Sequence, residues 1–236
     1  MTLPIKISPN PLISSLVEIR FHSELTDADM LSSVLPIFSK DFKPSFGKIP
    51  KELREKQPEQ FKYAPDFILS NDIYSISFGK YVITFENFGE YTFWGNYFAF
   101  IKEQLAKFLS LNIVTKIERI GVRYVSILEN VNNAYDVLNY FPSLSVPGYT
   151  EILNIHRATF IRQNCTLLLQ ILNNSKVTKN NIPKTGCIID IDAITTSNIT
   201  NDNVYSIIDK LHSEEKEFFF TLLNAEYLQQ LNPQYK

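Results

Sequence analysis

Several residue types and motifs that would identify a function are scarce or missing in this sequence. Glycine occurs 7 times and tryptophan once among 236 residues. Neither glycine-rich phosphate loop, G-x-x-x-x-G-K-[ST] or G-x-G-x-x-G, is found, and G-x-S-x-G, H-E-x-x-H and C-x-x-C are missing as well. These absences exclude most nucleotide-, flavin-, hydrolase- and zinc-dependent functions. We therefore expect no cofactor, and a non-enzymatic function is favoured over an enzymatic one.

Cysteine, net charge and long apolar runs are also limited. The two cysteines, Cys165 and Cys187, follow no metal-ligand spacing, which favours reduced, buried thiols. A net charge of −2 argues against a general electrostatic affinity for nucleic acid or anionic membranes. No apolar run approaches the roughly 20 residues that span a bilayer, and the proline-containing N-terminus has no apolar signal region. These features predict a soluble cytoplasmic protein that does not contact membranes.

What the sequence does contain is aromatic residues, 18 Phe and 12 Tyr, in alternating and helical patterns. Alternation predicts strands, and apolar residues at the 3.6 period predict helices. The expected elements are a strand at Leu12–Phe21, a helix capped by Thr26, a hairpin turning at Gly79-Lys80, an amphipathic helix over residues 92–112 with an apolar stripe from Trp94 to Phe108, a strand at Lys116–Leu128, a hairpin turning at Gln163-Asn164, a polar loop before the strand at Gly186–Ile194, and a helix from Asn203 to about Leu231. This order predicts an α+β fold, with a largely antiparallel, curved sheet packed on two long helices.

The order of elements also indicates two similar halves within one compact domain. The N-terminal half covers 1–128 and the C-terminal half covers 155–236, with an irregular joint at 129–154 between them. The N-terminal half contains a long segment, 40–65, with four prolines and seven Lys/Arg against four Asp/Glu. Connections of this length are often functional or disordered. The segment fits a solvated loop, and alternatively a basic arm, Lys40 to Lys62, that binds nucleic acid.

Three predicted strands carry charges on one face. In the strand KIERIGVRYVSIL, period-two alternation places Arg119, Gly121 and Arg123 on the same face, away from the apolar face. The glycine leaves a notch between two guanidinium groups, which suits a carboxylate or phosphate. Two further same-face pairs occur in the other strands, Asp190 with Asp192 and Glu18 with Arg20.

These charges allow three interpretations. In the first, the strands are neighbours and their charges pair across the sheet. In the second, they form a recognition surface for an anionic or peptide partner. In the third, Asp190 and Asp192 carry the metal or acid–base chemistry of a nuclease-like enzyme, which would need a third group such as Glu18 or His212.

The last predicted helix carries a carboxylate on its apolar stripe. At 100° per residue Glu215 falls near the centre of the stripe, and His212 lies at its edge one turn earlier. A carboxylate in that position must be paired, exposed at a helix end, or functional. The alternatives are an ion pair with an arginine such as Arg119 or Arg123, a partner-binding helix face, and a catalytic His–Glu dyad.

Taken in order, these motifs resemble those of a family of sporadically distributed, functionally uncharacterised bacterial proteins. The shared features are an N-P-L opening with a V-E-I-R-F strand (10–21), a tyrosine- and tryptophan-bearing helix (91–105), an R-I-G-V-R-Y strand (119–124), a D-I-D strand (190–192), and an L-H…F helix (211–219, with one extra position). The resemblance covers nearly the whole chain. The chain departs from the family pattern in its 40–65 segment and in the serine-rich entry to the first strand.

The resemblance implies no activity, but the family's patchy distribution is similar to that of genes in mobile elements, antiviral defence and toxin–antitoxin loci. It implies an accessory role beside an effector. Together with the missing catalytic motifs, it favours a protein-binding or regulatory subunit of a multi-protein bacterial system, whose partner is another protein encoded nearby. The expected contact residues are Glu18, Arg20, Arg119, Arg123 and Glu215.

Overall fold

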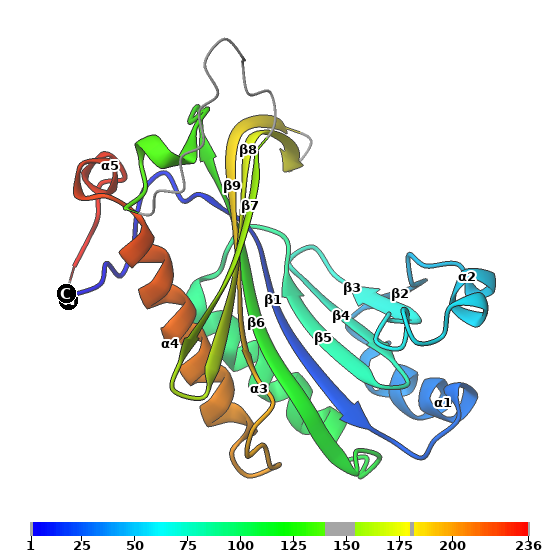
Figure 1. Cartoon of the computed structure of the whole chain (residues 1–236). Coiled ribbons are helices and arrows are strands. Elements are labelled where there is room, and N and C mark those ends of the chain that lie inside the picture. Colours follow the sequence, from blue (N-terminus) through cyan, green and yellow to red (C-terminus); the bar gives the residue numbers. More distant parts are fainter. Residues whose placement is uncertain (1, 140–153, 180–181, 236) are drawn as a thin grey trace. The chain divides into compact units, whose positions relative to one another are not determined.

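The computed structural model describes residues 2–139, 154–179 and 182–235, and within them the fold is α+β. Strands and helices follow one another along the chain as Figure 1 shows. The elements are β1 (Leu12–His22), α1 (Asp27–Phe38), β2 (Lys43–Phe46), α2 (Lys51–Lys56), β3 (Phe67–Ser70), β4 (Tyr74–Gly79), β5 (Val82–Asn87), α3 (Phe93–Leu109), β6 (Lys116–Glu129), the 3-10 helix η1 (Ala134–Asp136), β7 (Ile155–Arg162), β8 (Cys165–Lys179), β9 (Ile182–Thr195), α4 (Val204–Leu222) and α5 (Ala225–Gln230).

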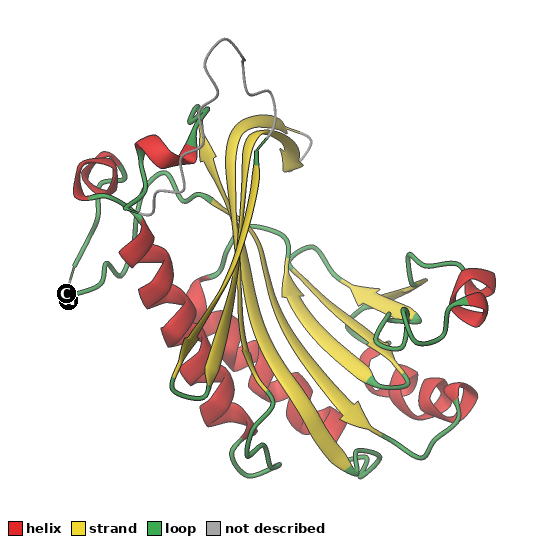
Figure 2. Ribbon diagram, in the orientation of Figure 1, coloured by secondary structure: helices red, strands yellow, loops and turns green. Residues whose placement is uncertain are grey.

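The strands of this described part are hydrogen-bonded in the order β2-β3-β4-β5-β1-β6-β9-β8-β7. The β2–β3, β3–β4, β4–β5, β5–β1 and β7–β8 ladders are antiparallel, and the long strands are visible in yellow in Figure 2. The predicted α+β class with a large antiparallel sheet is therefore confirmed. The described residues contain five α-helices, where two long ones were expected, and α3 and α4 are the longest of the five.

The chain forms two compact units that interleave along the sequence. Unit 1 consists of residues 1–14, 123–193 and 211–236, and unit 2 consists of residues 15–122 and 194–210. The units are thus not consecutive halves of the chain, and one boundary between them falls inside β6. The expected joint at 129–154 contains η1, and most of the remainder of that joint lies outside the described residues.

In unit 2 the core lies between strands and the helix α3. Alternation in β1 buries Val17, Ile19 and Phe21, as the sequence predicts. On α3 the buried residues recur at the helical period, and among them Tyr97 is fully buried. Its hydroxyl lies 2.6 Å from the carbonyl oxygen of Phe85 on β5 and 3.2 Å from that of Ser15 on β1. These hydrogen bonds join the helix to the backbone of two strands.

In unit 1 every second residue is buried in the first part of β8 and in the last part of β9. These residues are Cys165, Leu167, Leu169 and Ile171 on β8, and Cys187, Ile189, Ile191 and Ala193 on β9. The part of α4 that belongs to this unit packs on its strands, with the rings of Phe218 and Phe160 5.0 Å apart. Both cysteines are buried free thiols, as predicted.

Three expected elements differ from the structure. The segment 40–65 is not simply a loop, because residues 43–46 form β2 and 51–56 form α2. The expected polar loop after residue 172 is strand up to Lys179 and again from Ile182. Its residues alternate in exposure, so backbone pairing rather than apolar burial defines it. The expected helix to about Leu231 ends at Leu222, because Asn224 caps a separate helix, α5, by accepting a hydrogen bond from the Tyr227 N–H at 2.8 Å.

None of the helices in the described residues is long and apolar enough to cross a membrane.

Candidate functional site

The predicted site residues fall into the two units. Glu18, Arg20 and Arg119 belong to unit 2, whereas the remaining candidates, Arg123, Asp190, Asp192, His212 and Glu215, belong to unit 1. Each unit therefore presents its own charged cluster.

In unit 2 the carboxylate of Glu18 accepts hydrogen bonds from two arginines. The Nε atom of Arg20 donates to Oε1 of Glu18 at 2.7 Å, and Nη1 of Arg119 donates to the same oxygen. The side chain of Glu18 is 17% exposed and that of Arg119 is 15% exposed. This partial burial makes the charges strongly dependent on one another. The sequence suggests that Arg119 and Arg123 flank a notch for an external anion. On the Arg119 side, the carboxylate of Glu18 from the same chain takes that place.

The segment 40–65 is tied to this cluster. The Tyr63 hydroxyl donates to Oε2 of Glu118 at 3.2 Å, and the guanidinium carbon of Arg20 lies 4.3 Å from the centroid of the Tyr63 ring. Arg54 of the same segment forms an ion pair with Asp66, which follows the segment. The segment therefore has fixed contacts to the folded unit, which a free basic arm would lack.

In unit 1 Arg123 pairs with Asp190. Its Nε and Nη2 atoms donate to the two carboxylate oxygens at 2.8 and 2.6 Å. This two-point arrangement matches the planar fork of arginine to a carboxylate. The pair lies on the open face of the sheet, because the preceding and following positions of β6, Val122 and Tyr124, are buried on the other face. Opposite charges on neighbouring strands thus pair as the first interpretation of the sequence requires.

The Arg123–Asp190 pair lines an open pocket with a volume of about 480 Å³. The other charged and amide side chains around it are Arg157 on β7, Gln170 on β8 and Asp192 on β9. Arg157 and Gln170 stand opposite each other in the β7–β8 ladder. Sequence reasoning missed Arg157 and Gln170. The hairpin around Gln163-Asn164 fixes their register, so counting back from that turn could have found both residues.

His212 and Glu215 lie on the helix-covered face of unit 1, away from this pocket. The His212 ring packs on the Tyr124 ring at 5.5 Å between centroids, and Tyr124 points to the face opposite Arg123. Burial, with a smaller contribution from Lys216, lowers the pKa of His212 to about 3. Burial raises the pKa of Glu215 to about 8, against a small opposing effect of Lys216. Both side chains are therefore mainly uncharged at neutral pH.

Glu215 can therefore occupy the apolar stripe because its carboxyl group is protonated and uncharged at neutral pH. In the described part of the chain its carboxyl group has no arginine partner, and Arg123 is directed to Asp190 on the other face. The described residues contain no group of three His, Cys, Asp or Glu side chains that could hold a metal ion. Asp190 and His212 are separated by the sheet, so they do not form one acid–base or metal site.

Comparisons with known proteins give no match, either to a family model or to a curated protein.

Proposed function

We propose that this chain is a non-enzymatic, protein-binding subunit of a multi-protein bacterial system. The observation that carries the proposal is the open pocket of unit 1, where arginines and aspartates stand together on an uncovered sheet face. Groups of both signs fit a polypeptide, which offers carboxylates, ammonium groups and amides within a short length. The same arrangement fits a uniformly anionic ligand poorly, because Asp190 and Asp192 would repel it.

Apolar side chains extend this face. Ile161 on β7 is 78% exposed and Leu168 on β8 is 39% exposed. β7 is also the last strand in the order of the sheet, and an edge strand offers backbone groups to an extended partner segment. Exposed apolar residues next to paired charges are the composition expected for a protein contact surface. A role beside an effector in antiviral defence or in a toxin–antitoxin system is part of the proposal and rests on the family resemblance.

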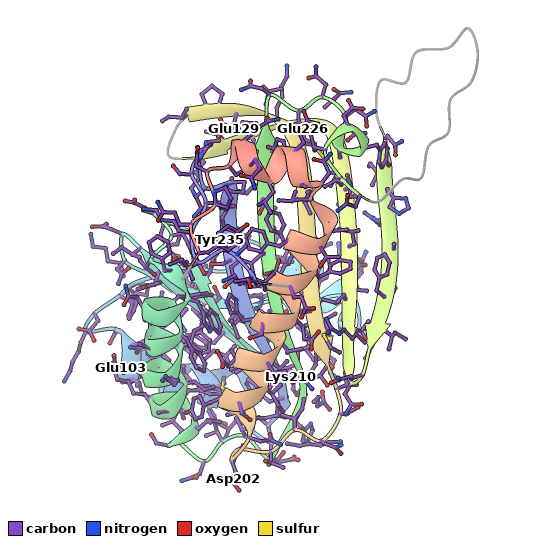
Figure 3. The ribbon with its side chains drawn as sticks, turned by 90° about the vertical axis from the view of Figure 1, so that its left-hand side faces the viewer. Glu103, Glu129, Asp202, Lys210, Glu226 and Tyr235 are labelled. Carbon is purple, nitrogen blue, oxygen red and sulfur yellow. The ribbon has the colours of Figure 1, made fainter. Side chains whose placement is uncertain are left out.

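The test is affinity purification of the tagged chain from its native cells, followed by mass spectrometry and native mass measurement. We expect a stoichiometric protein partner that is lost in the variant Arg123→Glu. The matched control is Lys107→Glu, which makes the same charge change on α3, where Lys107 pairs with the exposed Glu103 (Figure 3). Retention of the partner by Arg123→Glu, or purification of the chain alone, would contradict the proposal.

Hydrogen exchange of the purified complex locates the contact independently of mutation. We expect the partner to slow exchange in β7 and β8 relative to the isolated chain. Protection confined to unit 2 would show that the partner contacts unit 2 and not the pocket of unit 1.

A further inference from the structure

A second cavity, in unit 2, lies between the segment 40–65 and the elements around it. Its volume is about 650 Å³, within the range of roughly 300–1,000 Å³ found for small-molecule sites. The walls come from α1, β2, α2 and the chain after it, β3, and the turn between β4 and β5. This cavity shares no residue with the pocket of unit 1.

One part of the lining is aromatic and unusually accessible. Phe46 is 82% exposed, and its ring lies 5.7 Å from that of Phe67, which in turn stacks on Phe78 at 5.6 Å. Phe61 and Leu31 add further apolar surface to the walls. An aromatic ring left this accessible on a short edge strand is costly in water, and a flat apolar ligand would cover it.

Another part of the lining is cationic. The ammonium nitrogens of Lys62 and Lys80 lie 5.3 and 5.2 Å from the centroid of the same ring, that of Tyr81. All three residues line the cavity. Neither lysine forms an ion pair with the described residues. The Lys62 ammonium also lies 5.2 Å from the centroid of the Tyr63 ring. Two ammonium groups this close together create a local positive potential, and the cation–π contacts that hold them are weak enough, about 0.5–1 kcal/mol at exposed sites, to yield to an anion.

The remaining charges limit the size of that anion. Arg54 is paired with Asp66, and two more carboxylates, Asp27 and Glu55, line the cavity. A polyanion such as single-stranded nucleic acid would bring several phosphates near these acids. A ligand with one anionic group and an apolar body avoids them, because its charge needs to reach only Lys62 and Lys80.

We infer that this cavity binds a small amphipathic carboxylate. The apolar body lies against Phe46, Phe61 and Phe67, and the carboxylate accepts hydrogen bonds from Lys62 and Lys80. This site is independent of the proposed protein contact in unit 1, so either can fail while the other stands.

The probe is 8-anilinonaphthalene-1-sulfonate, whose aromatic body and single negative charge have both required parts. We expect saturable fluorescence enhancement with the purified chain, and displacement by 3-phenylpropionate but not by 3-phenylpropanol at the same concentration. The alcohol has the same ring and lacks the charge. An equal effect of both competitors, or no saturable binding, would overturn the inference.

Variants of the lining residues test whether the probe binds in this cavity. The double variant Lys62→Gln, Lys80→Gln should raise the Kd of the probe about tenfold, as expected for lost charge-assisted hydrogen bonds, whereas Lys107→Gln on α3 should not. Phe46→Ser should weaken binding, and Ile182→Ser, which removes an exposed apolar side chain from β9, should not. Circular dichroism shows that each variant is folded.

Unchanged binding in the lysine double variant would refute the inference. So would displacement of the probe by a single-stranded oligonucleotide with a steep dependence on salt, because that result would assign the lysines to nucleic acid instead.

Discussion

The guanidinium of Arg123 and the carboxylate of Asp190 form a two-point pair at 2.8 and 2.6 Å on the open sheet face of unit 1. The arginine side chain is 48% exposed, whereas the aspartate is 14% exposed. Water therefore competes for the guanidinium even while it is paired. A pair of this kind fixes the orientation of the arginine and contributes little to folding.

Arg123→Gln and Asp190→Asn should each lower the free energy of unfolding by less than about 1 kcal/mol. The double variant measures their coupling, which should be of the same size. Urea unfolding of the four proteins is the measurement. A coupling above about 2 kcal/mol would identify a structural pair and would weaken the case for a contact surface at this pocket.

Glu18 should matter more for stability than Asp190. Glu18→Gln leaves Arg20 and Arg119 without their shared anion in a partly buried position, and we expect a loss of about 1–3 kcal/mol. Glu24→Gln is the control, because Glu24 is 80% exposed and, among the residues that the structure describes, forms an ion pair only with His22. Its effect should stay within about 0.5 kcal/mol. Equal losses in the two variants would show that the Glu18 pairs are solvent-screened.

The sequence predicted the elements whose pattern is set locally. Alternation in β1, the hairpin of β4 and β5 and the apolar stripe of α3 each depend on a few neighbouring residues, and each appears in the structure. The turn of that hairpin is formed by Lys80 and Tyr81, one residue later than expected, because Gly79 pairs with Val82 as the last residue of β4. The strand ends at 173–179 escaped prediction because their side chains are polar. Asn173 is buried there, and its side-chain oxygen accepts a hydrogen bond from the Ala134 N–H at 2.9 Å. Such a contact depends on residues about forty positions away.

The candidate site was predictable only where a local pattern determines it. Period two places Arg119 and Arg123 on one face, but it does not say which carboxylate each will meet. That choice depends on which strands are neighbours and on their register. Arg119 meets Glu18 and Arg123 meets Asp190. The helical period places Glu215 on the apolar stripe, but its protonated state depends on how completely the folded chain buries it.

The buried pair of titratable groups on α4 predicts a distinctive pH dependence. The pKa of Glu215 is raised to about 8 from a usual 4.5, so its contribution to stability is complete below the usual value and is lost as the pH rises toward 8. The pKa of His212 is lowered to about 3 from 6.5, so its contribution is present above 6.5 and is lost as the pH falls toward 3. Between pH 4.5 and 6.5, a rise in pH lowers the contribution of Glu215 to stability and raises that of His212, so the two effects oppose each other.

Glu215→Gln should therefore gain stability relative to the unmodified chain as the pH rises from about 6 to 8, with a slope of at most about 1.4 kcal/mol per pH unit. Urea unfolding at several pH values measures this difference. Glu226→Gln, on α5 (Figure 3) and exposed, is the control and should leave the profile unchanged. Parallel profiles for Glu215→Gln and the unmodified chain would mean that Glu215 is ionised in the folded protein.

Tyr97 should contribute to stability through its hydroxyl group. Tyr97→Phe keeps the ring but leaves the carbonyls of Ser15 and Phe85 without this donor in the core of unit 2. We expect a loss of about 1–2 kcal/mol in the free energy of unfolding. Tyr235→Phe, at a 44% exposed position, should change it by less than about 0.5 kcal/mol. No difference between the two variants would mean that water replaces the lost hydroxyl.

The two thiols should be unreactive in the folded protein. Cys187 is fully buried and Cys165 is 3% exposed, and burial raises the pKa of Cys187 to about 12. Because the thiolate is the reactive form, an aromatic disulfide reagent should modify neither residue while the chain is folded. In concentrated guanidinium chloride without reductant it should titrate both. Rapid labelling of the folded chain would show that unit 1 opens readily, whereas no labelling after unfolding would reveal a disulfide between residues that the structure keeps as separate thiols.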